Sequence, residues 1–113
     1  MKSASSGLWL RIYIHESVRC GHQSLYEALV ALAHRERIAG ATVFRAVEGF
    51  GMHRHLHTTR LLDVSDDLPM ILEFVDNEPA IRHFIGLLDP MIPHGTAVVS
   101  PVEIVTYRME RPA

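Results

Sequence analysis

Three histidines in one short segment are the residues best suited to bind a metal ion. His53, His55 and His57 alternate along the chain, which holds eight histidines in 113 residues. If the segment is extended, the three imidazoles share one face and can reach one copper, zinc or nickel ion. Glu48, water or a neighbouring copy would supply a fourth ligand. The alternative is a polar loop whose histidines face solvent, or change charge as regulatory groups between about pH 5 and 8.

Two glycines one residue apart precede these histidines. Gly49 and Gly51 flank Phe50 at the end of an apolar stretch. Glycine lets backbone N–H groups approach an anion closely, so the pair predicts a phosphate-facing backbone. A glycine bulge, where a strand twists away from its sheet, would give the same pattern.

A second group of reactive side chains comprises His15, Glu16, Arg19, Cys20 and His22. A cysteine nucleophile needs an activating partner held in fixed geometry, and this spacing does not provide one. We therefore interpret the group as structural, with no role assigned to Cys20.

Four apolar stretches predict the strands that must position these residues. Apolar side chains alternate with a period of two over residues 8–14, and short β-branched or apolar stretches occupy 41–47, 70–75 and 97–105. Pro101 indicates that the last strand lies at an edge or contains a bulge, because proline cannot donate to the ladder.

Two helices lie between these strands. A Ser-x-x-Glu capping box at residues 24–27 precedes an apolar stripe, which predicts a helix from Leu25 to Ala39, ended by the glycine that follows. Asp76 or Asn77 begins a second amphipathic helix that ends at Asp89.

The element order is βαββαβ, which predicts an α+β ferredoxin-like fold with two helices on one face of a four-stranded antiparallel sheet. We assign residues 8–107 to one domain, residues 1–7 to a flexible leader and residues 108–113 to a C-terminal tail. Trp9 and Tyr13 lie opposite the apolar row of the first strand. The uncovered sheet face is therefore predicted to be an oligomer interface, unless these rings are singly exposed.

Composition restricts the partners. With a formal charge of −2 and 48% hydrophobic residues, the chain offers nucleic acid little net attraction. The single cysteine cannot form an internal disulfide, and no apolar stretch approaches the roughly 20 residues that span a bilayer. These features predict a cytoplasmic protein without membrane insertion.

Roughly twenty residues, from Gly49 to Pro69, connect the second and third strands, where a hairpin needs only about two to five. With Gly49-Phe-Gly at its start and an apolar strand at its end, this segment resembles the T-loop of PII signalling proteins. Leu25-Tyr-Glu-Ala-Leu-Val and Gly40-Ala-Thr-Val extend the similarity to the PII-like family called domain of unknown function 190, across residues 8–105.

The resemblance implies a homotrimer that binds ADP, ATP or AMP in clefts between subunits and has no catalytic activity or obligatory cofactor. Its T-loop would engage or release a protein or transporter partner. The residues that the resemblance places at the nucleotide are Arg45, Gly49, Phe50, Gly51, Met52, His53, Gly95 and Arg108.

Three departures from PII proteins are visible. Met52 and His53 replace a basic and a polar residue, and Pro93-His94-Gly95 lacks a lysine. No tyrosine occupies the loop tip, so control by uridylylation is not expected.

Two other functions fit the same fold class. A CutA-like metal-binding trimer would use the three loop histidines on a divalent metal. An acylphosphatase would need an arginine such as Arg19 beside an asparagine, and Asn77 is the only asparagine in the chain.

Overall fold

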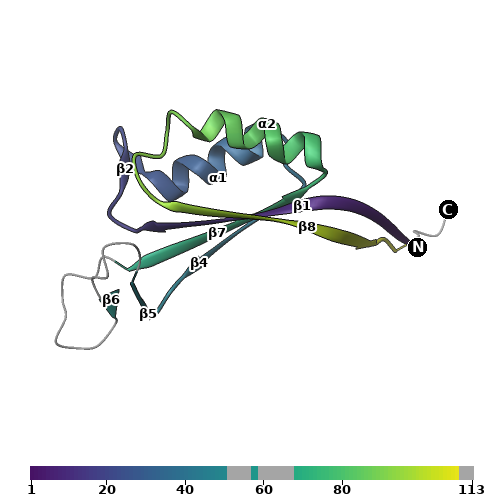
Figure 1. Cartoon of the computed structure of the whole chain (residues 1–113), viewed down its shortest axis with the longest axis horizontal. Helices are drawn as coiled ribbons and strands as arrows, with labels where there is room; N and C mark the ends of the chain where they lie inside the picture. Colours follow the sequence, from purple (N-terminus) through teal and green to yellow (C-terminus); the bar gives the residue numbers. More distant parts are fainter. Residues whose placement is uncertain (51–56, 59–67, 110–113) are drawn as a thin grey trace.

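The computed structural model describes residues 1–50, 57–58 and 68–109. Within these residues, four antiparallel strands form one sheet in the order β4-β7-β1-β8, and two helices cover one face of it (Figure 1). None of the helices in this part of the chain is long and apolar enough to cross a membrane. The predicted ferredoxin-like α+β fold is confirmed. The main elements are β1 (Lys2–His15), α1 (Leu25–Arg35), β4 (Gly40–Arg45), β7 (Pro69–Asp76), α2 (Glu78–Leu88) and β8 (Thr96–Tyr107).

Two small ribbons accompany the sheet. Strand β2 (Arg19–Cys20) pairs with β3 (Gln23–Ser24) before α1, and β5 (Glu48–Gly49) pairs with β6 (His57–Thr58) beyond the end of β4.

The core lies between the sheet and the helices. The predicted alternation in β1 is confirmed, because Leu8, Leu10, Ile12 and Ile14 are each at most 4% exposed. Apolar residues of both helices meet this row, and the rings of Phe74 and Phe84 pack at 4.8 Å between centroids. Burial of this row fixes which face of β1 carries the helices.

Helix α1 begins at the predicted residue, Leu25, but its N-terminal cap contact and its last residue differ from the prediction. Ser24 is the N-cap residue, and its hydroxyl donates to a Glu27 carboxylate oxygen at 3.0 Å instead of capping a backbone N–H. The helix ends at Arg35, not at Ala39, because Arg37 adopts a left-handed conformation with φ of 60°. The N–H of Ile38 then donates to the Ala33 carbonyl at 3.0 Å, which completes a Schellman motif with arginine in place of glycine.

Helix α2 is capped by Asn77, whose side-chain oxygen accepts a hydrogen bond from the Ala80 N–H at 2.9 Å. Replacing an N-cap side chain by alanine leaves that N–H without its acceptor. We expect Asn77→Ala to lower the free energy of unfolding by about 1 kcal/mol, measured by urea denaturation. Asn77→Asp keeps an acceptor and should retain most of the stability. Equal midpoints for Asn77→Ala and the wild type would contradict the capping role.

Residues 2–7, predicted to be a flexible leader, instead form the first half of β1. They pair with residues 102–107 of β8, whereas β7 ends opposite Leu8. Beyond that point the two strands continue as a projecting ribbon, here called the arm (residues 2–7 and 102–107; Figure 1). The radius of gyration is 16.4 Å, against about 13 Å for a compact domain of this length. The projecting segments therefore extend the molecule well beyond its core.

Glycine is required at the base of the arm. A Cβ atom on Gly7 would lie 2.5 Å from the carbonyl oxygen of Asp76, the last residue of β7. Only a residue without a side chain lets β1 pass the end of β7 and continue along β8. As predicted from Pro101, β8 is an edge strand.

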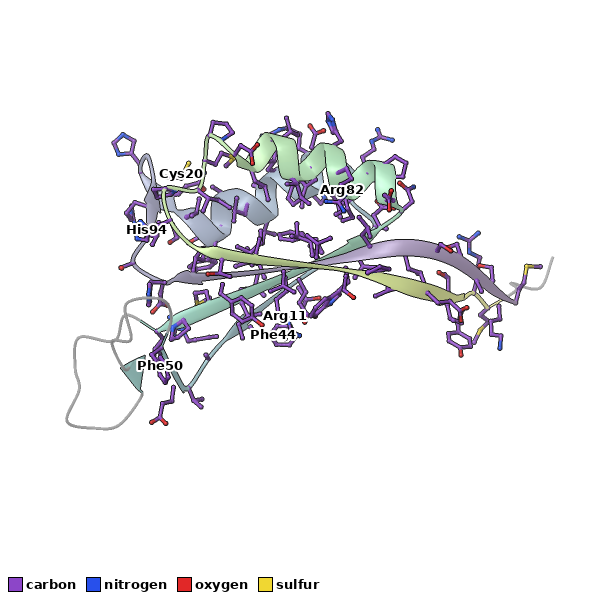
Figure 2. All side chains as sticks on the ribbon, viewed as in Figure 1. Arg11, Cys20, Phe44, Phe50, Arg82 and His94 are labelled. Atoms are coloured by element: carbon purple, nitrogen blue, oxygen red, sulfur yellow. The ribbon has the colours of Figure 1, made fainter. Side chains whose placement is uncertain are left out.

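The sheet face away from the helices is apolar with one ion pair at its centre. Figure 2 shows Arg11 and Phe44 on this side. The Arg11 Nε donates to a Glu73 carboxylate oxygen at 2.9 Å, and the guanidinium carbon lies 4.3 Å from the centre of the Trp9 ring. Hydrogen bonds to the Tyr13 hydroxyl and to Glu73 raise the pKa of Arg11, so the guanidinium stays charged.

Around this pair, three apolar side chains remain open to solvent: Tyr13 is 37%, Phe44 46% and Val98 43% exposed. Phe44 is the β4 residue that faces outward, while Val43 packs against the core. The face therefore presents several partly exposed apolar side chains around the Arg11–Glu73 pair.

Candidate ligand pocket at the loop base

A cavity of about 370 Å³ opens at the end of the sheet that carries β5 and β6. We call it the loop-base pocket. Figure 2 shows Phe50 and His94 at this end of the molecule. Four segments line the pocket: the end of β1, the residues that follow β4, the start of β7 and the turn before β8. The lining residues are 13–15, 46, 48–50, 69, 71 and 94–96.

Backbone pairing holds the loop side of the pocket. The Ala46 N–H donates to the Pro69 carbonyl at 2.9 Å, which ties the end of β4 to the start of β7. Gly49 then pairs with His57, and its Cα faces Pro69 so closely that an added Cβ would lie 3.3 Å from the proline ring. Glycine at this position therefore lets the chain pass over Pro69 and enter the β5–β6 ribbon.

Gly95 shapes the opposite wall. A Cβ atom here would lie 3.0 Å from the Tyr13 carbonyl oxygen and 2.9 Å from a methyl carbon of Ile14. The turn before β8 can therefore lie directly on β1 only with glycine at this position. This contact brings His94 and Thr96 into the same pocket as Tyr13.

Three of the residues assigned to the nucleotide, Gly49, Phe50 and Gly95, line the loop-base pocket. Four other candidates, Gly51, Met52, His53 and His55, lie outside the described residues. His57 lies on β6, where its backbone pairs with that of Gly49. The position of Gly49 and Gly95 in one pocket is what the resemblance to PII proteins implies.

The two arginines lie elsewhere. Arg45 stands opposite Met70 in the ladder, so its side chain is on the helix-bearing side of β4, where it forms an ion pair with Glu16. Arg108 follows the arm, and its N–H donates to the Met1 carbonyl at 2.7 Å. The arm tip pairs Lys2 with Tyr107 and the pocket end pairs Tyr13 with Thr96, a separation of about 36 Å along the strands. Neither arginine lines the pocket of its own chain.

Among the described residues no site for either alternative function is assembled, and His53 and His55 of the metal-binding alternative lie outside them. In the part of the chain that the structure describes, no group of three or more His, Cys, Asp or Glu residues could hold a metal ion. The Arg19 guanidinium donates to the His22 carbonyl, whereas Asn77 caps α2 at the other end of the sheet. An arginine–asparagine phosphatase site is therefore not formed by this pair.

Sequence reasoning missed Tyr13, His15 and His94 as pocket residues. Tyr13 was assigned to the uncovered face and His15 to a structural group, and both lie at the end of β1. They meet residues 94–96 only through the β1–β8 register, which pairs Tyr13 with Thr96. No local pattern indicates such a pairing across more than eighty residues.

Comparisons with known proteins agree with this geometry. Residues 7–104 match the family model of domain of unknown function 190, described as an uncharacterized ACR. The UPF0166 protein of Aquifex aeolicus is 32% identical over 76 residues, which cover 67% of this chain and 72% of that protein.

Two solved structures share the fold. CPII, a nitrogen regulatory PII-like protein from Thiomonas intermedia bound to ADP, AMP and bicarbonate, gives a TM-score of 0.63 at 18% identity and covers 94% of this chain and 92% of its own. The divalent ion tolerance protein CutA1 from Ehrlichia chaffeensis gives 0.52 at 12% identity and covers 92% and 83%. These likenesses show the fold, and the family match covers nearly the whole domain. The chain belongs to the family of domain of unknown function 190, and its fold is that of PII-like proteins.

Proposed function

We propose that this protein is a PII-like signalling module that binds an adenine nucleotide in its loop-base pocket. The observation that carries the proposal is the placement of Gly49, Phe50 and Gly95 around one cavity at the base of the loop. The cavity volume of about 370 Å³ lies in the range of small-molecule sites. The binding of ADP and AMP by CPII, which has the same fold, supports the same ligand class here.

The lining suggests how such a ligand would be held. Phe50 and Ile71 offer apolar surface to a purine base, while the backbone beside Gly49 and Gly95 can approach phosphate oxygens. Because Gly49 also pairs with His57, a ligand that contacts this backbone acts directly on the ladder that closes the base of the loop. The segment from Gly49 to Pro69 would then signal the bound state to a protein or transporter partner.

A homotrimer would complete the site. The exposed apolar face beneath the sheet gives one copy a surface to bury against others. Arg108 is too far along the arm to serve the pocket of its own chain, so it would serve the pocket of a neighbouring copy. In that arrangement, residues of two subunits contact one nucleotide.

Thermal unfolding with ADP, ATP and AMP tests the proposal. A ligand at about one hundred times its Kd stabilises the native state by about 2.7 kcal/mol, which corresponds to a rise of about 10 °C in Tm for a domain of this size. GTP serves as the control for the purine base. The absence of a shift with every adenine nucleotide at millimolar concentration would reject this function.

A further inference from the structure

The loop-base pocket has no permanent positive charge among its described lining residues. They include neither lysine nor arginine, and Glu48 contributes a carboxylate. Arg45, adjacent to the lining residue Ala46, lies on the other face of the sheet with Glu16. A phosphate group would therefore enter a pocket to which the described lining residues contribute one carboxylate and no permanent positive charge.

Two histidines also line this pocket. His15 ends β1 and is half-buried, while His94 lies in the exposed turn before β8. Continued beyond the Tyr13–Thr96 pair, the antiparallel register places residue 95 opposite residue 14 and residue 94 opposite residue 15. The 2.9 Å approach of a Gly95 Cβ to Ile14 shows that the turn still follows this register. The two imidazoles therefore belong to facing positions at the mouth of one cavity.

Resting on the proposed function, we propose that His15 and His94 are the cationic residues that bind the ligand phosphate, so that binding takes up protons. Histidine is the side chain that gains its charge just below neutral pH. Two facing imidazolium groups repel each other, and an anion between them removes that repulsion.

Among the described residues around the histidines, the other ionisable groups do not supply this charge. Tyr13 on β1 carries a phenol, Glu48 on β5 carries a carboxylate, and the Glu16–Arg45 pair beyond the end of β1 is internally compensated. Affinity for a phosphate-bearing ligand should therefore fall as pH rises. A unit charge a few ångströms from a phosphate at a solvated site changes affinity by about tenfold.

Calorimetric titration of ADP at about pH 6 and about pH 8.5 tests this assignment. Because ADP itself titrates in this range, each variant is compared with the wild type at the same pH. His94→Gln should bind ADP about tenfold more weakly at the lower pH and nearly as the wild type at the higher pH. His94→Lys should bind about tenfold more tightly than the wild type at the higher pH. His34→Gln, an exposed position on α1, should follow the wild type at both.

Pyrophosphate is the second probe and separates this inference from the proposed function. Pyrophosphate is expected to raise the Tm of the wild type at the lower pH, and His15→Gln and His94→Gln should each reduce this rise. That result supports the histidine site, even if no nucleotide binds. Wild-type affinity for ADP in both glutamine variants at the lower pH overturns it. So does the absence of any pH-dependent shift with either probe.

Discussion

If the protein forms the proposed trimer of about 38 kDa, replacing Phe44 and Val98 together by glutamate is expected to convert it into single chains of 12.7 kDa. Both side chains lie on the uncovered sheet face and are more than 40% exposed in the single chain. In a trimer that buries this face, two added carboxylates per subunit would lose water, and Arg11, which stands opposite Val98 in the ladder, is already paired with Glu73. A desolvated, unpaired charge costs several kcal/mol, which is enough to prevent association.

Light scattering coupled to gel filtration measures this mass. Exposed surface substitutions usually change the stability of a single chain by less than about 0.5 kcal/mol, so circular dichroism should show a folded monomer. Ala31→Glu, at an exposed position of α1, is the matched control and should remain trimeric. A glutamate double variant that keeps the trimer mass would place the interface on another surface. A wild-type protein that runs as a monomer would reject the trimer itself.

Replacing Gly95 by alanine is expected to remove nucleotide binding and to destabilise the protein. The added Cβ would lie 3.0 Å from the Tyr13 carbonyl oxygen, a backbone atom that cannot move without shifting β1. The turn before β8 must therefore move away from β1, which displaces His94 and Thr96 from the pocket wall. Forcing one extra methyl group into a packed contact costs about 1 to 3 kcal/mol.

Urea denaturation and ADP titration measure the two effects. Gly86→Ala is the control, because its Cβ would meet no atom within 4 Å on the exposed side of α2. Alanine is the better helix former, so this variant should gain up to about 1 kcal/mol and bind ADP as the wild type does. Unchanged ADP affinity in Gly95→Ala would exclude the loop-base pocket as the nucleotide site.

The fold could be predicted because its signals are local. The apolar row of β1 and the stripes of α1 and α2 each repeat within one element, and burial confirms them. The end of α1 could not be predicted. The left-handed residue that ends the helix was expected to be Gly40, but Arg37 adopts this conformation. The leader was misassigned for a similar reason: its small polar residues are ordered by pairing with β8, not by their own propensity.

Candidate site residues could be assigned only where a family pattern marks them. Gly49, Phe50 and Gly95 were assigned to the nucleotide from their resemblance to PII proteins; all three line one pocket, and their role in binding stays a prediction. Arg45 was assigned to the nucleotide from the same resemblance, but strand alternation with Val43 turns its side chain toward Glu16. His15 and His94 could not be paired from sequence, since their proximity depends on a register between the two long strands.

The arm also determines when the chain can finish folding. β1 is the first strand to be synthesised, yet its sheet neighbours β7 and β8 are the last two, and the outermost pair joins Lys2 to Tyr107. Contacts between such distant residues close a long loop and slow folding. During translation, the apolar side chains of β1 therefore stay exposed, without β7 or β8 beside them, until nearly the whole domain has left the ribosome. A strand exposed for that time is a template for aggregation, so the yield of native protein should depend on chaperones that shield the nascent N-terminal strand.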